Sequence, residues 1–314
     1  MTPALFQGIK ENGERAIGRE LSSRAADRMH EHRQTFITEE DFRWIAAQGF
    51  DFVRLPVGYW LFEAAESFVE GEDYVKRAFR WAHTYGLKVI LDFHGLQGSQ
   101  NGQDHSGQVG RVKFYKRRYT SRALATVDYL TREYGHEPAL LAVELINEPK
   151  VRWFICRLVR YYERAYKVAQ RNVAPGIKII VSDAFQPLRL ARALGRRRLG
   201  DQLVLDVHLY QLFSSADEAL TYDEHIQKIE QQWRPLLDKL NDYVPVLVGE
   251  WSAALPAKAL AGVESHEAYR HYYAAQKKLF DELAWGHSYW SYKAPGNGPW
   301  DYASYGLERH TKQH

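Results

Sequence analysis

Features typical of disulfide-bonded, membrane-spanning or strongly charged proteins are scarce in this sequence of 314 residues. A single cysteine, Cys156, excludes an internal disulfide. No run of 18 apolar residues occurs, so no membrane span is predicted. The 42 Lys and Arg residues nearly balance the 39 Asp and Glu residues, which leaves a net charge of +3. That balance gives no reason to expect a nucleic acid or an anionic membrane as a partner.

Motifs of several other enzyme classes are also missing. There is no G-x-G-x-x-G for a dinucleotide, no G-x-S-x-G for a serine nucleophile and no H-E-x-x-H for zinc. The only H-x-x-x-H pairs His310 with His314 at the carboxyl terminus. His94 and His208, with nearby acids, have ligand types that suit zinc or iron, but the pattern is too incomplete to predict a metal.

Three local features are expected to have no role in function. The amino terminus, from Met1 to Leu5, lacks a basic segment followed by an apolar run, so no signal peptide is visible. Cys156 follows Phe154 and Ile155 in a helical pattern, which predicts a packed thiol. The basic run Arg189 to Arg198 is expected to be a solvated helix face and turn.

What the sequence does contain is an alternation of short apolar runs with longer amphipathic ones. The predicted strands are Leu5–Ile9, Phe52–Pro56, Lys88–Phe93, Leu140–Ile146, Ile177–Ser182, Leu203–Leu209, Val244–Gly249 and His287–Tyr292. The predicted helices are Thr38–Gln48, Asp73–Tyr85, Ser121–Tyr134, Arg152–Asn172, Leu188–Leu194, Tyr222–Leu240 and His266–Leu283. Because no linker interrupts the alternation, residues 1–314 are predicted to form one α/β domain, a single (β/α)8 TIM barrel. An open, doubly wound sheet would want the missing phosphate loop.

Two glutamates follow buried strands of this pattern. They lie in Ile146-Asn147-Glu148-Pro149 and in Val248-Gly249-Glu250-Trp251-Ser252. The carboxyl ends of barrel strands carry the active site, and a pair of carboxylates is what cleavage of a glycosidic bond requires. A surplus of aromatic residues, with 9 Trp, 20 Tyr and 14 Phe, suits a cleft in which sugar rings stack.

Other polar or aromatic residues fall on or just after predicted strands. They are Arg54, His94, Asn147, His208, Tyr210 and Trp290. An arginine inside an apolar strand needs a carboxylate partner, so Arg54 is expected to pair with one of the glutamates. Held close to Glu250, it would keep that group ionised. The long polar loop from Gly95 to Arg118 follows the third predicted strand and is expected to serve the same face.

In these segments the chain resembles glycoside hydrolase family five, and within it the exo-β-1,3-glucanase-like branch. The resemblance rests on five motifs in order: Val53-Arg54-Leu55-Pro56-Val57-Gly58-Tyr59-Trp60, His94-Gly95-Leu96-Gln97-Gly98-Ser99-Gln100-Asn101-Gly102, Asn147-Glu148-Pro149, His208-Leu209-Tyr210-Gln211-Leu212-Phe213 and Gly249-Glu250-Trp251-Ser252. The resemblance as a whole extends from about Phe36 to Trp300. Asn-Glu-Pro alone is a weak signal, but the five together are highly specific.

The resemblance implies a role for each matching residue. Glu148 would be the general acid/base and Glu250 the nucleophile. Asn147 would bind the sugar 2-hydroxyl, and Trp290 would lie under that sugar. The remaining matches would support the carboxylates and the sugar (Arg54, His94, His208, Tyr210) or clamp the next sugar (Phe213).

The chain departs from the family pattern in two places. Relatives usually carry Phe, Asp and Asn after Ser-Gln-Asn-Gly, whereas this sequence has Gln103, Asp104 and His105. The aromatic partner of Phe213 is therefore missing, which weakens the case for a β-1,3-glucan substrate. The opening segment from Gly8 to Gly13 also replaces the usual Gly/Trp-rich strand.

The sequence thus predicts a retaining β-glycosidase acting on β-1,3-glucan or another β-glucoside by double displacement, with the two carboxyl groups about 5–5.5 Å apart. Alternatives are an endo-β-1,4-glucanase, a mannanase, an aryl or lipid β-glucosidase, or a non-catalytic carbohydrate-binding barrel. No cofactor is implied, because two carboxylates suffice. The expected partner is the sugar substrate alone, and a monomer is expected.

Overall fold

The computed structural model describes residues 3–151, 155–197, 199–296 and 298–307. Its contacts divide the chain into two compact units. The N-terminal unit comprises Pro3–Ala184 and Arg196–Val204, and the C-terminal unit comprises Phe185–Gly195 and the chain from Leu205 onward. His310 and His314 lie outside the described residues.

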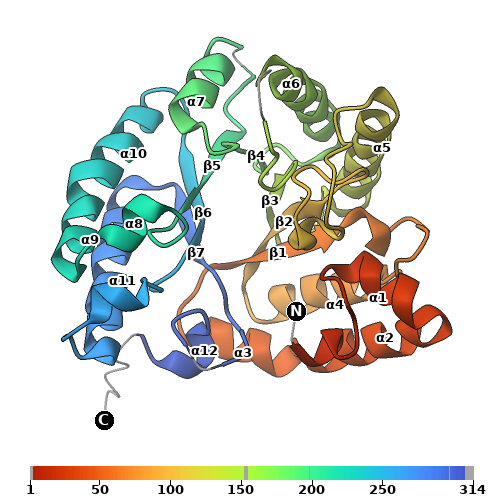
Figure 1. Ribbon diagram of the computed structural model, residues 1–314. Helices are drawn as coiled ribbons and strands as arrows, with labels where there is room; N and C mark the ends of the chain where they lie inside the picture. Colours follow the sequence, from red (N-terminus) through yellow and green to blue (C-terminus); the bar gives the residue numbers. More distant parts are fainter. Residues whose placement is uncertain (1–2, 152–154, 198, 297, 308–314) are drawn as a thin grey trace. The chain divides into compact units, whose positions relative to one another are not determined.

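Four parallel strands form the sheet of the N-terminal unit, which runs from red to green in Figure 1. They are β1 (Phe52–Gly58), β2 (Lys88–Gly95), β3 (Leu140–Glu144) and β4 (Lys178–Ser182). Each pairs with the next, so their carboxyl ends lie at one edge of the sheet. Strand β2 is buried from its second residue to its last, as its apolar run predicts.

Three helices precede β1: α1 (Glu14–Leu21), α2 (Ala25–Thr35) and α3 (Glu39–Ala47). Three more separate the four strands: α4 (Glu72–Thr84), α5 (Arg117–Tyr134) and α6 (Ile155–Asn172). The predicted start of α3 is confirmed, because Thr38 and Asp41 form a reciprocal capping box. Helix α6 covers the predicted segment from Ile155 onward, and Arg152 lies outside the described residues. The packed thiol was predicted wrongly, since Cys156 is exposed in the first turn of α6.

The C-terminal unit repeats the alternation of strands and helices. Its strands are β5 (Leu203–Leu209), which begins at the boundary between the units, β6 (Val246–Trp251) and β7 (Gly286–Tyr289), again parallel in this order. Its helices are α7 (Pro187–Gly195), α8 (Ser215–Ala219), α9 (Tyr222–Lys228), α10 (Arg234–Asn241), α11 (Ser265–Leu283) and α12 (Tyr302–Tyr305). A π-helical turn, Ile229–Trp233, joins α9 to α10, so the predicted helix Tyr222–Leu240 is continuous but not uniform.

The first predicted strand is wrong. Residues Pro3–Phe6 form a 3-10 helix, and Gly8 turns the chain with a φ of 79°. Leu5 is buried against Ile17, Ala25 and Met29 of α1 and α2 instead of in a sheet. The apolar run Leu5–Ile9 therefore predicts burial of Leu5 correctly but predicts the wrong secondary structure. Among the described helices, none is long and apolar enough to cross a bilayer.

Candidate active site

Arg54 is the centre of a buried charge cluster at the strand ends of the N-terminal unit. Its guanidinium donates to Glu144 Oε2 at 2.8 Å and lies 3.1 Å from Asp92 Oδ2. It also donates to Asn147 Oδ1 at 2.9 Å. Both carboxylates are fully buried, and Arg54 compensates their charge. The need for a carboxylate partner is confirmed, but the partners are Glu144 and Asp92 and not residues of the predicted pair; an approach to Glu148 or Glu250 stays a prediction.

Asn147 and Glu148 are held by the backbone beyond β3. The Asn147 amide N–H donates to the carbonyl of Phe93 on β2 at 3.2 Å. The side chain of Gln100 donates to the carbonyls of His94 and Asn147, at 2.7 and 3.0 Å. One buried amide thus ties the loop after β2 to the segment that carries Glu148. Glu148 has a φ of 44°, in the left-handed region that residues other than glycine seldom occupy.

The loop after β2 is anchored by Trp60, whose indole leaves no room for a side chain at neighbouring glycines. A Cβ atom would lie 2.5 Å from the ring at Gly95 and 2.4 Å at Gly107. Gly107 has a φ of 89°, and its carbonyl accepts from the Arg15 backbone at the start of α1. This packing fixes the short 3-10 turn Asp104–Ser106, and with it the position of His105.

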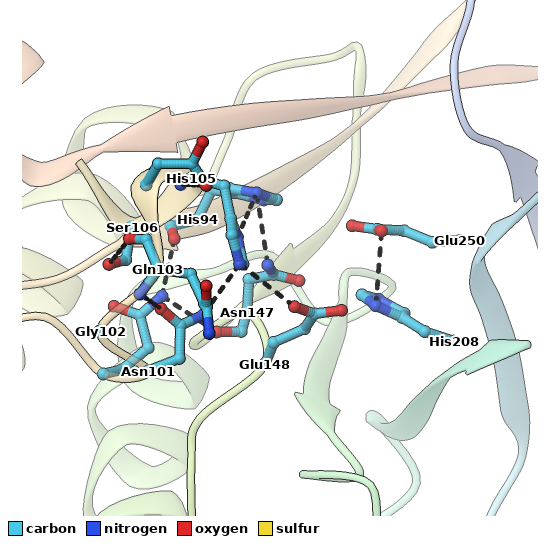
Figure 2. A network of polar contacts seen from close by, with 12 residues as sticks. His94, Asn101, Gly102, Gln103, His105, Ser106, Asn147, Glu148, His208 and Glu250 are labelled. Carbon is cyan, nitrogen blue, oxygen red and sulfur yellow. Dashed lines mark hydrogen bonds and ion pairs between the residues drawn. The ribbon is translucent and has the colours of Figure 1, made fainter. Parts of the chain in front are cut away.

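His105 joins His94 to Glu148, as Figure 2 shows. The His94 Nδ1 atom lies 2.6 Å from Asp92 Oδ2, and its Nε2 atom lies 3.3 Å from His105 Nδ1. His105 Nε2 in turn lies 3.4 Å from Glu148 Oε2. The result is a continuous line of polar contacts from a buried carboxylate to the predicted acid/base.

In the C-terminal unit, Glu250 is the last residue but one of β6 and is contacted by residues of β5 and of the segment after it. The Tyr210 hydroxyl donates to Glu250 Oε2 at 3.0 Å. His208 Nδ1 lies 3.5 Å from the same oxygen (Figure 2), and His208 Nε2 lies 3.1 Å from Asp206 Oδ2. His208 can donate to both carboxylates only in its doubly protonated form. The Tyr210 hydroxyl and the His208 ring both approach Glu250, an arrangement that suits an ionised carboxylate.

Gly249 is required by the contact between β5 and β6. Its N–H donates to Asp206 Oδ1 at 2.7 Å, and a Cβ atom at this position would lie 2.3 Å from that oxygen. Only glycine lets Asp206 approach the backbone beside Glu250 so closely. Asp206 therefore fixes both the strand that carries Glu250 and the imidazole that contacts it.

Aromatic side chains surround the Glu250 end of the C-terminal unit. Tyr210, Phe213 and Trp300 have ring centroids 5.2 to 6.2 Å apart. Phe213 is 73% exposed, so its ring is available to a ligand. Trp290 follows the last residue of β7 instead of lying on the strand, and its N–H donates to the Trp251 carbonyl at 2.8 Å.

Tyr289 supports the segment after β6. Burial raises the pKa of its hydroxyl well above the usual value, so the group stays protonated. The hydroxyl donates to the Pro299 carbonyl and accepts from the Ala253 N–H. This keeps the backbone that follows Glu250 attached to the segment before Trp300.

Apart from Arg54, which lies inside β1, the predicted site residues fall near or beyond strand ends, but several of their partners were not identified from the sequence. Asp92, Glu144 and Asp206 lie inside predicted strands and are fully buried. His105 stood out only as a departure from the family pattern. An Asp-x-His spacing at two strand ends, Asp92 to His94 and Asp206 to His208, is the signal that could have revealed two of them.

Comparison with known proteins identifies the family. The family model "Cellulase (glycosyl hydrolase family 5)" matches residues 11–296. The chain is 33% identical to glucan 1,3-beta-glucosidase 2 of Wickerhamomyces anomalus over 81% of its own length and 62% of the relative's. It is 30% identical to glucan 1,3-beta-glucosidase of Kluyveromyces lactis over 96% of its length and 82% of the relative's.

Among solved structures, the rutinosidase from Aspergillus niger superposes with a TM-score of 0.78 at 18% identity, over 93% of this chain and 85% of that one. This likeness confirms the predicted (β/α)8 TIM barrel fold. The family match and the two glucosidase relatives confirm the resemblance that the five motifs predicted. The chain belongs to the cellulase family, glycosyl hydrolase family 5.

Proposed function

We propose that this protein is a retaining β-glycosidase that hydrolyses β-1,3-glucan or a related β-glucoside. The observation that carries the proposal is the different setting of the two glutamates. Donors from Tyr210 and His208 converge on Glu250, which suits an ionised nucleophile. Glu148 instead faces His105, beside a loop held in place by Gln100 and Trp60.

In this mechanism Glu250 attacks the anomeric carbon while Glu148 gives its proton to the leaving oxygen. The bond from the anomeric carbon to that oxygen breaks, and a glycosyl-enzyme ester forms. Glu148 then takes a proton from water, which displaces Glu250 and releases the sugar with its original anomeric configuration. The two carboxyl groups are expected to lie about 5–5.5 Å apart in the active enzyme.

The other predicted residues have supporting roles in this proposal. Asn147 binds the sugar 2-hydroxyl, Trp290 lies under the same sugar, and Phe213 contacts the next one. Arg54, His94, His208 and Tyr210 orient the carboxylates and the sugar. We further propose that residues 1–314 act as one catalytic domain and as a monomer, which light scattering of the purified protein tests.

The substrate class follows from the two relatives, which are both named glucan 1,3-beta-glucosidases. A second candidate is an aryl or lipid β-glucoside. It is favoured by Gln103, an exposed polar residue where an aromatic partner for Phe213 is expected, because this change alters the leaving-group side.

The test is product analysis on laminarin, laminari-oligosaccharides, cellulose, mannan and aryl β-glucosides. We expect glucose released singly from laminari-oligosaccharides, with β-glucose as the first anomer seen by proton NMR. Activity on aryl or lipid glucosides alone would favour the second candidate, and α-glucose as the first product would contradict a retaining mechanism. Glu250→Gln is the control, and unchanged activity in this variant would overturn the assignment. A lack of activity on every substrate would favour a non-catalytic carbohydrate-binding protein.

A further inference from the structure

The hydrogen-bond partners of His94 decide which of its ring nitrogens carries a proton. Its Nδ1 atom lies 2.6 Å from Asp92 Oδ2, so this nitrogen is the donor. Its Nε2 atom lies 3.3 Å from Asn147 Nδ2. The orientation of that amide is fixed, since Asn147 Oδ1 accepts from Arg54, which can only donate. His94 Nε2 therefore faces an N–H donor and is the acceptor.

The same reasoning fixes the tautomer of His105. Its Nδ1 atom lies 3.3 Å from the acceptor nitrogen of His94, so Nδ1 carries the proton. Its Nε2 atom lies 3.3 Å from Asn101 Nδ2. The Asn101 amide is oriented by the Gln103 backbone N–H, which donates to Asn101 Oδ1 at 3.0 Å. His105 Nε2 therefore presents a lone pair.

The Asn101 N–H donates to this lone pair, and Glu148 Oε2 lies 3.4 Å from the same nitrogen, at the long end of hydrogen-bonding distance. If Glu148 were ionised, the lone pairs of its Oε2 atom would repel the lone pair of His105 Nε2. A protonated Glu148 can instead donate its hydrogen to that nitrogen. The polarity of the whole line, from Asp92 through both imidazoles, thus favours the acid form of Glu148.

We propose that His105 is a positioning residue that accepts the acidic hydrogen of Glu148 at Nε2 and holds this glutamate ready to protonate the leaving group. The inference rests on the proposed role of Glu148 as acid/base, and it adds a group that the sequence marks only as a family departure. His105 does not touch the reacting atoms; it acts through Glu148.

The charged groups around His105 are consistent with a neutral ring. His94 and Glu148 face it directly, and Asp104 of its own turn accepts from the His105 backbone N–H at 2.9 Å. Asp92 lies beyond His94, where Arg54 compensates its charge. Asp104 is thus engaged by a backbone N–H and Asp92 by Arg54.

Two variants of His105 separate the contact with Glu148 from the packing of the loop. In His105→Asn the amide reaches the position of Nδ1, so the contact with His94 survives and the one with Glu148 is lost. In His105→Gln the longer side chain places an acceptor oxygen near the position of Nε2. Thermal melts followed by circular dichroism show whether each variant folds.

The readout is the pH dependence of kcat/KM on a β-glucoside with a poor leaving group, for which protonation by Glu148 is essential. We expect the alkaline limb of the profile to move to lower pH by about one unit in His105→Asn, because the acid form loses its acceptor. In His105→Gln the displacement should be smaller. An unmoved limb, a move to higher pH, or equal displacement in both variants overturns the proposal.

A second measurement needs no activity and so separates this inference from the proposed function. Nitrogen-15 NMR of the histidine rings of the wild-type protein at neutral pH should give His105 as the Nδ1–H tautomer, assigned by its absence from either variant. An Nε2–H or doubly protonated ring would overturn the proposal. If the protein cleaves no glycoside while His105 is the Nδ1–H tautomer, the proposed glycosidase function is wrong but the proposed tautomer of His105 is confirmed.

Discussion

The two units of the chain use the same Asp-x-His spacing to opposite effect. In the C-terminal unit Asp206 contacts His208, which directly contacts Glu250 together with the Tyr210 hydroxyl. In the N-terminal unit Asp92 contacts His94, but a second imidazole, His105, stands between His94 and Glu148.

The additional imidazole of His105 changes the type of hydrogen-bonding group that faces the glutamate, from a donor at Glu250 to an acceptor at Glu148. The Tyr210 hydroxyl donates to Glu250, whereas in the proposed arrangement Glu148 donates to the lone pair of His105 Nε2. Under the proposed mechanism, two carboxyl groups with the same intrinsic chemistry are thereby prepared for different tasks, Glu250 as nucleophile and Glu148 as acid. The following experiments test this difference, in order of decreasing effect.

Replacing either glutamate by alanine should have the largest effect on activity and should distinguish the two roles. We expect Glu250→Ala to lower kcat by about 10⁴-fold or more on every substrate, because no covalent intermediate can form. Glu148→Ala should spare the first step for dinitrophenyl glucosides, whose leaving group needs no proton. Sodium azide should then yield a β-glycosyl azide from Glu148→Ala and, with a β-glycosyl fluoride, an α-glycosyl azide from Glu250→Ala. The opposite pairing would exchange the two roles.

Removal of the Tyr210 hydroxyl tests the donors that converge on Glu250. We expect Tyr210→Phe to lower kcat/KM by about 10- to 100-fold, as the loss of a hydrogen bond to a charged group does. Tyr222→Phe is the matched control, because that hydroxyl donates to the Ala268 carbonyl away from Glu250. Equal losses in the two variants would mean that the Tyr210 contact is not specific.

A methyl group at Gly249 tests whether Asp206 fixes Glu250 through the backbone. Because the added Cβ would lie 2.3 Å from Asp206 Oδ1, we expect Gly249→Ala to lower the free energy of unfolding by about 1–3 kcal/mol and to reduce activity. Gly176→Ala is the control, since that position has open space and an ordinary φ. Urea denaturation followed by fluorescence measures both, and equal stability would contradict the tight contact.

The smallest expected effect is on the acid stability of the N-terminal unit. Burial lowers the pKa of His32 from 6.5 to about 4, with a further contribution from Arg33. The unfolded state therefore binds a proton more readily, so the stability from neutral His32 is present above pH 6.5 and is lost as pH falls toward 4. Urea midpoints between these pH values should fall less steeply in His32→Gln. An unchanged slope would argue against a buried neutral imidazole.

Much of the fold was predictable because buried parallel strands have a strong apolar signature. Seven of the eight predicted strands are present, and Leu5–Ile9 is wrong because a short apolar run signals burial without specifying the backbone. Helix α2 was missed since only Ala25 and Met29 are buried along it, which leaves almost no amphipathic pattern.

Most of the predicted site residues could be proposed because they lie near strand ends, where polar residues stand out against apolar runs. The sequence did not identify Asp92, Glu144 and Asp206, because an acidic residue inside an apolar strand has no evident role until its partner is known. The contact of His105 with Glu148 depends on a loop whose path is set by Trp60 and Gly107, far apart in sequence. No local pattern contains that information.

The backbone of Glu148 has a cost that reaches beyond the reaction. A φ of 44° at a residue with a side chain costs about 1–2 kcal/mol, which glycine would not incur. Under the proposed mechanism, the protein loses part of its resistance to heat and denaturant because the acid/base residue occupies this turn. Glu148→Gly should melt at a higher temperature than the wild type while failing to protonate a leaving group. Such a variant would be a stable, inactive protein suited to structures of complexes with intact substrates.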